Sequence, residues 1–137
     1  MIKILTIGKI KEKNIKLMVE EFLNRINRFY KTELLELNEE AILRLIERED
    51  SCIVACDEKG EMLCSVEFSS FIKEKINNKN LIFVVGDENG LSSEIKNKSN
   101  LKLSFSKMTF LHDMFKLILV EQIYRAFTIS KGMKYHR

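Results

Sequence analysis

The stretch of sequence richest in groups that could bind a ligand is LSFSKMTFLHDM, residues 103–114. Three hydroxyl side chains alternate here with phenylalanine and methionine, and one of the two histidines of the chain follows. An apolar slot with a few fixed polar groups suits a nucleoside-like ligand. A simpler interpretation is that Thr109 caps the helix that follows. Both a ligand-binding loop and a helix cap are therefore open alternatives for this segment.

Histidines near the end of the chain are candidates for proton transfer. His112 could serve as a general base, although an isolated histidine is more often a structural residue. Its place at the start of a predicted helix suits hydrogen bonding as a neutral imidazole. In the tail, residues 131–137, Tyr135 could stack on a nucleic-acid base and Arg137 could bind a phosphate. The ordinary expectation for such a terminus is disorder.

A loop with two glycines, GDENGL at residues 86–91, follows an apolar segment. Glycine allows close backbone approach or a positive φ. The loop lacks the lysine and the hydroxyl of a P-loop and is not a dinucleotide-binding fingerprint, so it is a weak phosphate motif. A simple turn built on Asn89 and Gly90 explains it equally well.

Several other kinds of site have no support in the sequence. Cys52, Cys56 and Cys64 form no CxxC pair, and their odd number argues against a disulfide framework. Both histidines lie far from them in sequence, so we expect free thiols in a reducing compartment and no metal site. No Ser-His-Asp arrangement or carboxylate pair stands out, which leaves hydrolase chemistry unsupported.

The elements that must position these groups alternate between strands and helices. Apolar runs predict strands at 2–8, 32–37, 51–57, 81–86 and 101–105, and helical spacing predicts helices at 14–29, 39–47, 65–76, 92–95 and 110–130, with a turn at 58–61. This alternation implies an α/β fold with a parallel sheet covered on both faces. Ligands of such sheets bind beyond the carboxyl ends of the strands, which singles out 56–61, 86–92 and 104–112.

The last predicted helix is apolar around most of its circumference. Glu121, Arg125 and Thr128 form its one narrow polar strip, and the first two are spaced as an i,i+4 ion pair. A helix of this kind needs burial on two sides. In so small a protein a second copy could cover one of those sides, so we predict a homodimer through this helix.

Composition places the chain among globular proteins outside the membrane. Its 137 residues are 45% hydrophobic, and no apolar run reaches the ~20 residues that span a bilayer. We expect one cytoplasmic domain over 1–137, because a signal-peptide pattern is also missing. Residues 1–31 carry 8 basic and 3 acidic side chains, residues 32–61 carry 3 and 10, and residues 96–137 carry 9 and 2. Basic ends brought onto one face would suit a polyanion such as nucleic acid.

Four segments together resemble the RlmH family of SPOUT-class methyltransferases: KILTIGKIKEK, FVVGDENGL, LSFSKMTFLHDM and LVEQIYRAFTISKGMKYHR. The resemblance covers nearly the whole chain and is densest from Leu81 to Arg137. It implies a parallel-sheet α/β/α fold with a C-terminal trefoil knot, a homodimer, and S-adenosylmethionine (SAM) as methyl donor. The implied substrate is N3 of a pseudouridine in 23S ribosomal RNA on the assembled ribosome, with no metal and no membrane involved.

The resemblance also maps functional residues onto this chain. The SAM site maps onto Cys56, Gly86, Phe105, Ser106, Lys107, Met108, Thr109 and Phe110. The catalytic residues map onto His112, Tyr135, His136 and Arg137. The expected base for the N3 proton is His112 or His136, with Tyr135 as the alternative. Arg137 would hold a phosphate or stabilise charge that develops on the target base.

Two positions depart from the family pattern. Asp87 stands where the family usually has a second glycine, and Leu111 stands where it usually has proline. Asp87 adds a charge near the cofactor, and Leu111 loses the fixed φ that favours the first turn of a helix. Neither change removes a catalytic group. Two other functions stay open: a non-catalytic ribosome-binding factor with the same fold, and a SPOUT methyltransferase with another RNA target.

Overall fold

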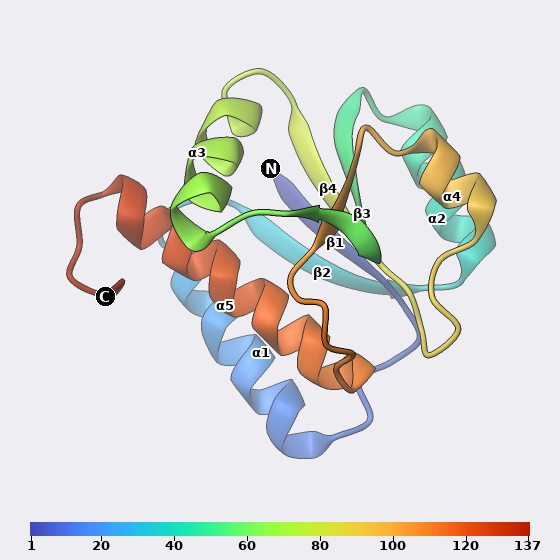
Figure 1. Cartoon of the computed structure of the whole chain (residues 1–137), viewed down its shortest axis with the longest axis horizontal. Helices are drawn as coiled ribbons and strands as arrows, with labels where there is room; N and C mark the ends of the chain where they lie inside the picture. The colour runs from blue at the N-terminus through green and yellow to red at the C-terminus, as the bar shows by residue number, and fades with distance from the viewer.

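A five-stranded parallel sheet lies at the centre of the computed structural model, which describes residues 1–137. The strand order is β2-β1-β4-β3-β5. The strands are β1 (Ile2–Ile7), β2 (Thr32–Leu37), β3 (Ser51–Met62), β4 (Asn80–Val85) and β5 (Leu101–Ser104), and the helices are α1 (Lys13–Ile26), α2 (Glu39–Arg48), α3 (Ser65–Ile76), α4 (Ser93–Lys98) and α5 (His112–Ser130). Helices cover both faces of the sheet (Figure 1). The predicted α/β architecture is confirmed, and the trefoil knot stays a prediction.

The side chains of β4 show why the sheet needs cover on both faces. Leu81, Phe83 and Val85 belong to a core shared with α1, α3 and α5. Ile82 and Val84 alternate with them and join a second core under α2 and α4. Neighbouring residues of a strand face opposite sides of a sheet, so this continuous apolar run is buried only between two helical layers.

Side-chain caps mark the beginnings of two helices on the second face. The Asn38 side chain accepts a hydrogen bond from the backbone N–H of Ala41 at 2.9 Å, before α2. The Ser92 hydroxyl accepts from the backbone N–H of Ile95 at 3.3 Å, before α4. Such bonds satisfy N–H groups that the first turn of a helix leaves without a partner. Ser92 is thus the N-cap residue of α4.

Strand β3 is longer than the sequence predicted. It continues through the expected turn at 58–61 as far as Met62 and pairs with β5, with an irregularity in register between Cys56 and Glu61. Gly60 permits this pairing, because a Cβ there would lie 2.6 Å from the carbonyl carbon of Lys102. The prediction of a turn at 58–61 is wrong, since the glycine serves a close approach between two backbones.

The predicted boundaries of three helices also need correction, and the first is α4, which ends at Lys98 rather than at residue 95. α5 begins at His112 rather than Phe110, and its N-cap residue makes no side-chain hydrogen bond. The interpretation of Thr109 as the cap is therefore wrong. α1 ends at Ile26 instead of residue 29, because the Asn27 side-chain amide donates to backbone carbonyl oxygens on both sides of the turn that follows.

Helix α5 packs between α1 and α3 over one face of the sheet (Figure 1). Leu119, Val120 and Ile123 are fully buried there. Much of the apolar circumference of α5 is thus covered within one chain. Arg125 Nη2 lies 2.7 Å from Glu121 Oε1, which confirms the predicted i,i+4 pair. Neither α5 nor any other helix is long and apolar enough to cross a membrane.

We predict that Phe83→Ala lowers the free energy of unfolding by roughly 3–5 kcal/mol, as is typical of a large buried aromatic side chain. Phe83 is fully buried, and its ring packs edge-on against that of Phe68 at 5.9 Å. Urea unfolding followed by circular dichroism measures the change. Val66→Ala, at an exposed position of α3, is the control and should stay within about 0.5 kcal/mol of the parent. An equally small loss at Phe83 would contradict its place in the core.

Candidate functional site

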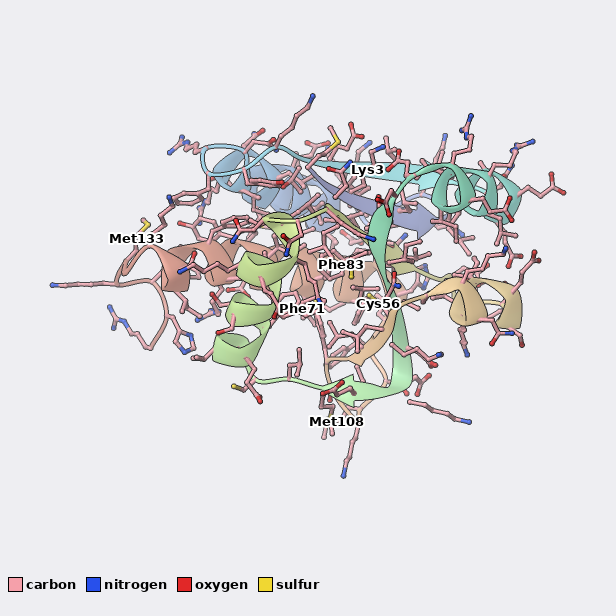
Figure 2. All side chains as sticks on the ribbon, turned by 90° about the horizontal axis from the view of Figure 1, so that it is seen from above. Lys3, Cys56, Phe71, Phe83, Met108 and Met133 are labelled. Atoms are coloured by element: carbon pink, nitrogen blue, oxygen red, sulfur yellow. The ribbon has the colours of Figure 1, made fainter.

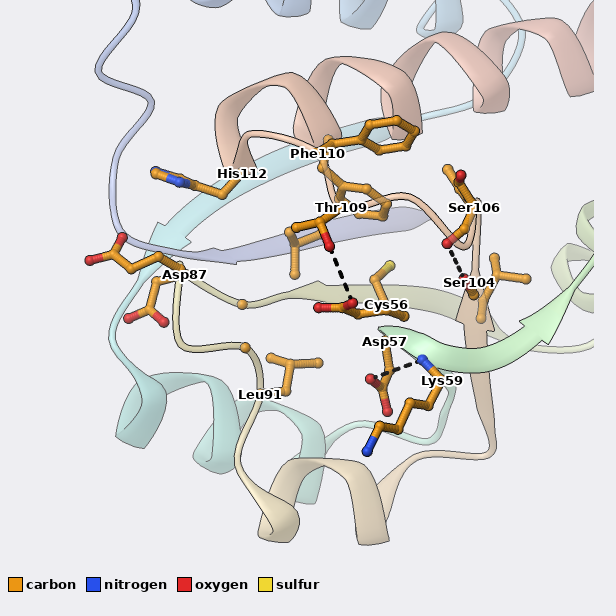
Figure 3. Close-up of a pocket in the computed structure, with 18 of the residues that line it drawn as sticks. Cys56, Asp57, Lys59, Asp87, Leu91, Ser104, Ser106, Thr109, Phe110 and His112 are labelled. Atoms are coloured by element: carbon orange, nitrogen blue, oxygen red, sulfur yellow. Dashed lines mark hydrogen bonds between the residues drawn. The ribbon is translucent and has the colours of Figure 1, made fainter.

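Strand β3, at residues 56–59, and the carboxyl ends of β4 and β5 surround a cavity of about 420 Å³ (Figure 3). Its wall consists of residues 56–59, 85–91, 103–106 and 108–110, together with Lys96, His112 and Phe115. Parallel strands end at the same edge of a sheet, which is why the loops after β4 and β5 meet here beside β3. These residues fall in the three segments that the strand pattern singled out, although 56–59 belong to β3 and not to a loop.

Most of the residues predicted to bind the cofactor line this cavity. They are Cys56, Gly86, Phe105, Ser106, Met108, Thr109 and Phe110, and His112 joins them from the start of α5. Lys107 does not line the cavity, although both of its neighbours do. Tyr135, His136 and Arg137 are also absent from its wall.

The turn between Gly86 and Gly90 leaves no room for additional atoms. Asp87 Oδ1 accepts from the backbone N–H of Asn89 at 2.9 Å, and the Gly90 N–H donates to the Asp87 carbonyl at 3.0 Å. Gly90 has a φ of +77°, and a Cβ on Gly86 would lie 2.5 Å from the carbonyl carbon of Gly90. Both glycines are therefore required by the backbone geometry. Asp87, the departure from the family pattern, uses its carboxylate to brace this turn.

The loop after β5 is shaped by its own hydroxyl groups. Ser104 Oγ donates to the Ser106 carbonyl at 3.0 Å, and Ser106 Oγ accepts from the backbone N–H of Met108 at 2.9 Å. The Thr109 hydroxyl donates to Glu58 Oε2 at 3.5 Å, across the cavity mouth from β3. Phe105 anchors the loop by packing its ring 5.2 Å from that of Phe115. Polar side chains thus set the loop conformation and also face the cavity.

Acidic side chains also line the cavity, and three of them were not predicted to bind a ligand. They are Asp57, Glu58 and Glu88, which join Asp87. Lys96 offsets one of these charges, since its Nζ lies 3.5 Å from Asp57 Oδ2. Carboxylates at a cavity mouth suit cationic groups and hydroxyls of a ligand. The sequence signal that could have identified them was their position directly after apolar runs, at the end of β4 for Asp87 and Glu88 and inside β3 for Asp57 and Glu58.

Neither Cys56 nor Tyr135 suits the role of a general base, because both side chains keep their proton at neutral pH. Burial raises the pKa of Cys56 to about 12, so its thiol stays neutral and is a poor nucleophile. Burial also raises the pKa of Tyr135, and the hydrogen bond from its hydroxyl to Glu121 adds to that effect. Among the candidates for a base in this conformation, only His112 lies on the cavity wall.

The C-terminal tail lies at the opposite end of α5 from the cavity. Tyr135 donates its hydroxyl to Glu121 Oε1 at 2.9 Å, and His136 Nδ1 lies 3.1 Å from Arg125 Nη1. Glu121 and Arg125 follow His112 by 9 and 13 residues, which is roughly 14 and 20 Å along the axis of α5. Within one chain the predicted catalytic residues of the tail therefore do not join His112.

A family model described as "Predicted SPOUT methyltransferase" matches residues 1–136. The chain belongs to the SPOUT methyltransferase family. It is 42% identical to "Ribosomal RNA large subunit methyltransferase H" of Caldicellulosiruptor bescii, with both chains covered completely. It is 43% identical to the protein of the same name from Malacoplasma penetrans, with 99% of each chain covered. The resemblance stated from the sequence motifs is thereby confirmed.

Solved structures share the SPOUT fold at much lower sequence identity. A probable methylase family protein from Haemophilus influenzae Rd KW20 has a TM-score of 0.65 and 11% identity, over 99% of this chain and 70% of that chain. The SpoU methyltransferase AviRb from Streptomyces viridochromogenes, solved with its cofactor AdoMet, has a TM-score of 0.53 and 11% identity, over 90% of this chain and 56% of that chain. At this level of identity the likeness supports the fold.

We predict that one of the three thiols of this SPOUT protein reacts rapidly with a maleimide at about pH 8. Cys64 is exposed, whereas burial raises the pKa of both Cys52 and Cys56. Brief labelling followed by proteolysis and mass spectrometry identifies the modified thiol, and urea should expose all three. Cys64→Ser should abolish the fast reaction. Fast labelling of Cys56 in the folded protein would contradict the raised thiol pKa in the cavity wall.

Proposed function

We propose that this protein is a SAM-dependent methyltransferase that modifies large-subunit ribosomal RNA. The observation that carries the proposal is the full-length match to proteins named ribosomal RNA large subunit methyltransferase H. The loops that resemble the cofactor site of the RlmH family also build one cavity. We treat 1–137 as one domain because one sheet contains every strand, and we place its action in the cytoplasm with the ribosome.

The cavity fits SAM in size and in chemistry. Its volume of about 420 Å³ lies within the range of small-molecule sites. SAM combines a cationic sulfonium and ammonium with ribose hydroxyls, a carboxylate and an apolar adenine face. Asp57 and Asp87 suit the cations and hydroxyls, and Phe105 and Phe110 offer apolar contacts to the adenine. The compact turn at Gly86 would let a ligand approach the main chain closely.

The distribution of basic residues supports an RNA substrate. Residues 1–31 and 96–137 hold 17 of the 23 lysines and arginines. The helices that these segments form, α1 and α5, pack side by side (Figure 1). Exposed lysines of α1 and of the tail, such as Lys13, Lys16 and Lys134, attract the phosphates of a nucleic acid independently of its sequence.

The finer specificity that we propose is N3 of a pseudouridine on the assembled ribosome, and its support is the RlmH resemblance. Bound SAM supplies an electrophilic methyl group, so the protein's own tasks are alignment and proton removal. N3 of the uracil ring carries a proton that must leave as the nitrogen gains its methyl group. His112 accepts this proton, directly or through a water molecule. Loop hydroxyls and the main chain at Gly86 hold the reactants in line.

We further propose a homodimer through the outer face of α5. Leu111 and Met114 are 62% and 42% exposed, and Ile118 is half-buried one turn later on the same face. A row of exposed apolar side chains marks an interaction surface. Met108 before the helix and Met133 after it also project outward, at separate places in Figure 2.

An antiparallel pairing of two α5 helices would complete the site. It would set the tail of one chain near the cavity of its partner, because the tail packs on the second half of the helix whose first turn lines the cavity. Tyr135, His136 and Arg137 would then reach the RNA that is bound at the partner's cavity. Arg137 would hold a phosphate there or stabilise charge on the target base.

We predict that the purified protein transfers a radiolabelled methyl group from SAM to one nucleotide of large-subunit RNA in unmethylated ribosomes. His112→Gln should lower the single-turnover rate by roughly 100-fold or more, as expected for loss of a general base. Ser70→Ala, at an exposed position of α3, is the control and should retain full activity. Mass mapping locates the modified nucleotide.

Three outcomes of that assay would contradict parts of the proposal. Ribosome binding without any methyl transfer would favour a non-catalytic ribosome-binding factor. Methylation of a different RNA would favour a SPOUT enzyme with another target. Unchanged single-turnover rates in His112→Gln would remove His112 as the base.

The dimer proposal predicts that two inactive subunits restore activity when they are combined. One subunit carries Gly86→Ala, which crowds the turn at the cavity, and the other lacks residues 134–137. Each alone should be inactive, whereas the heterodimer contains one intact cavity facing one intact tail. Coexpression with two affinity tags isolates the heterodimer for the methylation assay. If the purified heterodimer is as inactive as its parents, the tail does not act across the dimer.

A further inference from the structure

The first turn of α5 holds a buried carboxylate with one oxygen unused. Asp113 is 4% exposed, and its Oδ2 accepts from the backbone N–H groups of Lys11 at 2.9 Å and Glu12 at 3.1 Å. Its Oδ1 is buried and accepts no hydrogen bond. Buried carboxylate oxygens usually have partners, so this oxygen beside the cavity requires an explanation.

Two nitrogen atoms face this unused oxygen. His112 Nε2 lies 3.5 Å from Asp113 Oδ1, and Lys116 Nζ lies 3.6 Å from the same atom. Lys116 is fully buried, and its ammonium also donates to the carbonyl of Gly8 at 3.5 Å. A buried ammonium needs a carboxylate nearby. The positive charge of Lys116 therefore stabilises Asp113 at this position as an ionised carboxylate.

Several groups decide the charge of Asp113. Burial raises its pKa, but the backbone N–H groups of Glu12 and Lys11 and the charges of Lys116 and His112 together lower it below its ordinary value. The carboxylate is therefore ionised at neutral pH, with Oδ1 directed at a histidine on the cavity wall. That oxygen can accept a hydrogen bond from an N–H group, but it has no proton to donate.

We propose that Asp113 is a positioning residue that fixes the ring tautomer of His112 for proton transfer. With Nε2–H directed at Asp113, the lone pair on Nδ1 of His112 is the one left to accept a proton at the cavity. Resting on the proposed function, we identify that proton as the one on N3 of the target base. It moves from N3 to Nδ1, and the imidazolium that forms faces an ionised carboxylate.

The distance and the neighbouring charges agree with this role. An N···O separation of 3.5 Å is longer than an ordinary hydrogen bond, and catalytic contacts are often long until the reactive complex forms. Asp113 is the one residue that forms an ion pair with His112. Asp87 and Glu88 line the same cavity from the loop after β4, and Figure 3 shows His112 at the rim on the side of Asp87.

Asp113→Asn tests the proposal and can keep the two backbone hydrogen bonds, but it removes the negative charge that faces the buried Lys116 ammonium. The asparagine amide can be placed in two orientations. With its oxygen at the position of Oδ2 it keeps both hydrogen bonds from Lys11 and Glu12, whereas with its NH₂ group there it would face two N–H donors. The NH₂ group therefore takes the place of Oδ1 and points at Nε2 of His112. The asparagine NH₂ can donate only to a lone pair on Nε2, so the proton of the His112 ring must then be on Nδ1.

The expected result is a change of tautomer measured by ¹⁵N NMR of the full chain under conditions where the ring is neutral. The parent should carry the His112 proton on Nε2, and Asp113→Asn should carry it on Nδ1. His136, the other histidine, is the internal control and should not change. Single-turnover methylation by Asp113→Asn should fall by roughly 10²–10⁴-fold while SAM affinity is retained.

The outcomes separate this inference from the proposed function. A parent ring protonated on Nδ1, or the same tautomer in both proteins, would overturn the positioning role, and the parent spectrum decides even if the variant does not fold. Full methylation activity in a variant whose tautomer has changed would also overturn it. A changed tautomer in a protein whose parent methylates no ribosomal RNA would support the positioning role and refute the proposed function.

Discussion

Pairing between β3 and β5 is the interaction on which the functional edge of this protein depends. The two strands run side by side from Val54 and Leu101 onward, and β3 then passes an irregularity in register and pairs again as far as Met62. Gly60 allows the two backbones to meet at a distance that a Cβ would forbid. This pairing holds residues 56–59 against the loop that follows β5. Because β4 lies on the other side of β3, the turn at Gly86 completes the same cavity.

Helix α5 connects this cavity to the rest of the molecule. Its first turn supplies His112 to the cavity wall, while Asp113 accepts hydrogen bonds from the loop between β1 and α1. Its middle is buried between α1 and α3, and Glu121 and Arg125, from the midpoint of the helix onward, hold the tail. One rigid helix therefore fixes both the cavity and the tail, and it sets the distance that a second subunit would have to bridge. The free energy of this arrangement comes mainly from apolar burial, as in most domains.

The sheet and the site loops could be predicted from the sequence because their signals are local. Apolar runs such as residues 81–85 predict a strand buried on both faces, and the ends of such strands point to the ligand loops. The extension of β3 could not be predicted, since Gly60 resembles a turn residue until the backbone of β5 is placed beside it. The absence of Lys107 from the wall is likewise a matter of side-chain direction, which spacing does not determine.

The role of Asp113 was hidden in the sequence for a different reason. Its partners, the N–H groups of Lys11 and Glu12, are about a hundred residues away along the chain and belong to the backbone, so no residue type marks them. A carboxylate in the first turn of a helix is ordinarily explained by the helix dipole alone. Its buried, unpaired oxygen appears only when the fold brings the β1–α1 loop, His112 and Lys116 together.

Direct ultraviolet cross-linking tests most directly whether SAM binds between residues 56–59 of β3 and the loops after β4 and β5. SAM labelled in its methyl group is irradiated with the native protein, and the labelled peptides are mapped by mass spectrometry, with excess unlabelled SAM as competitor. We expect competable label on peptides from residues 56–59, 85–91 or 103–112. Competable label confined to other segments, or no competable label at all, would contradict it.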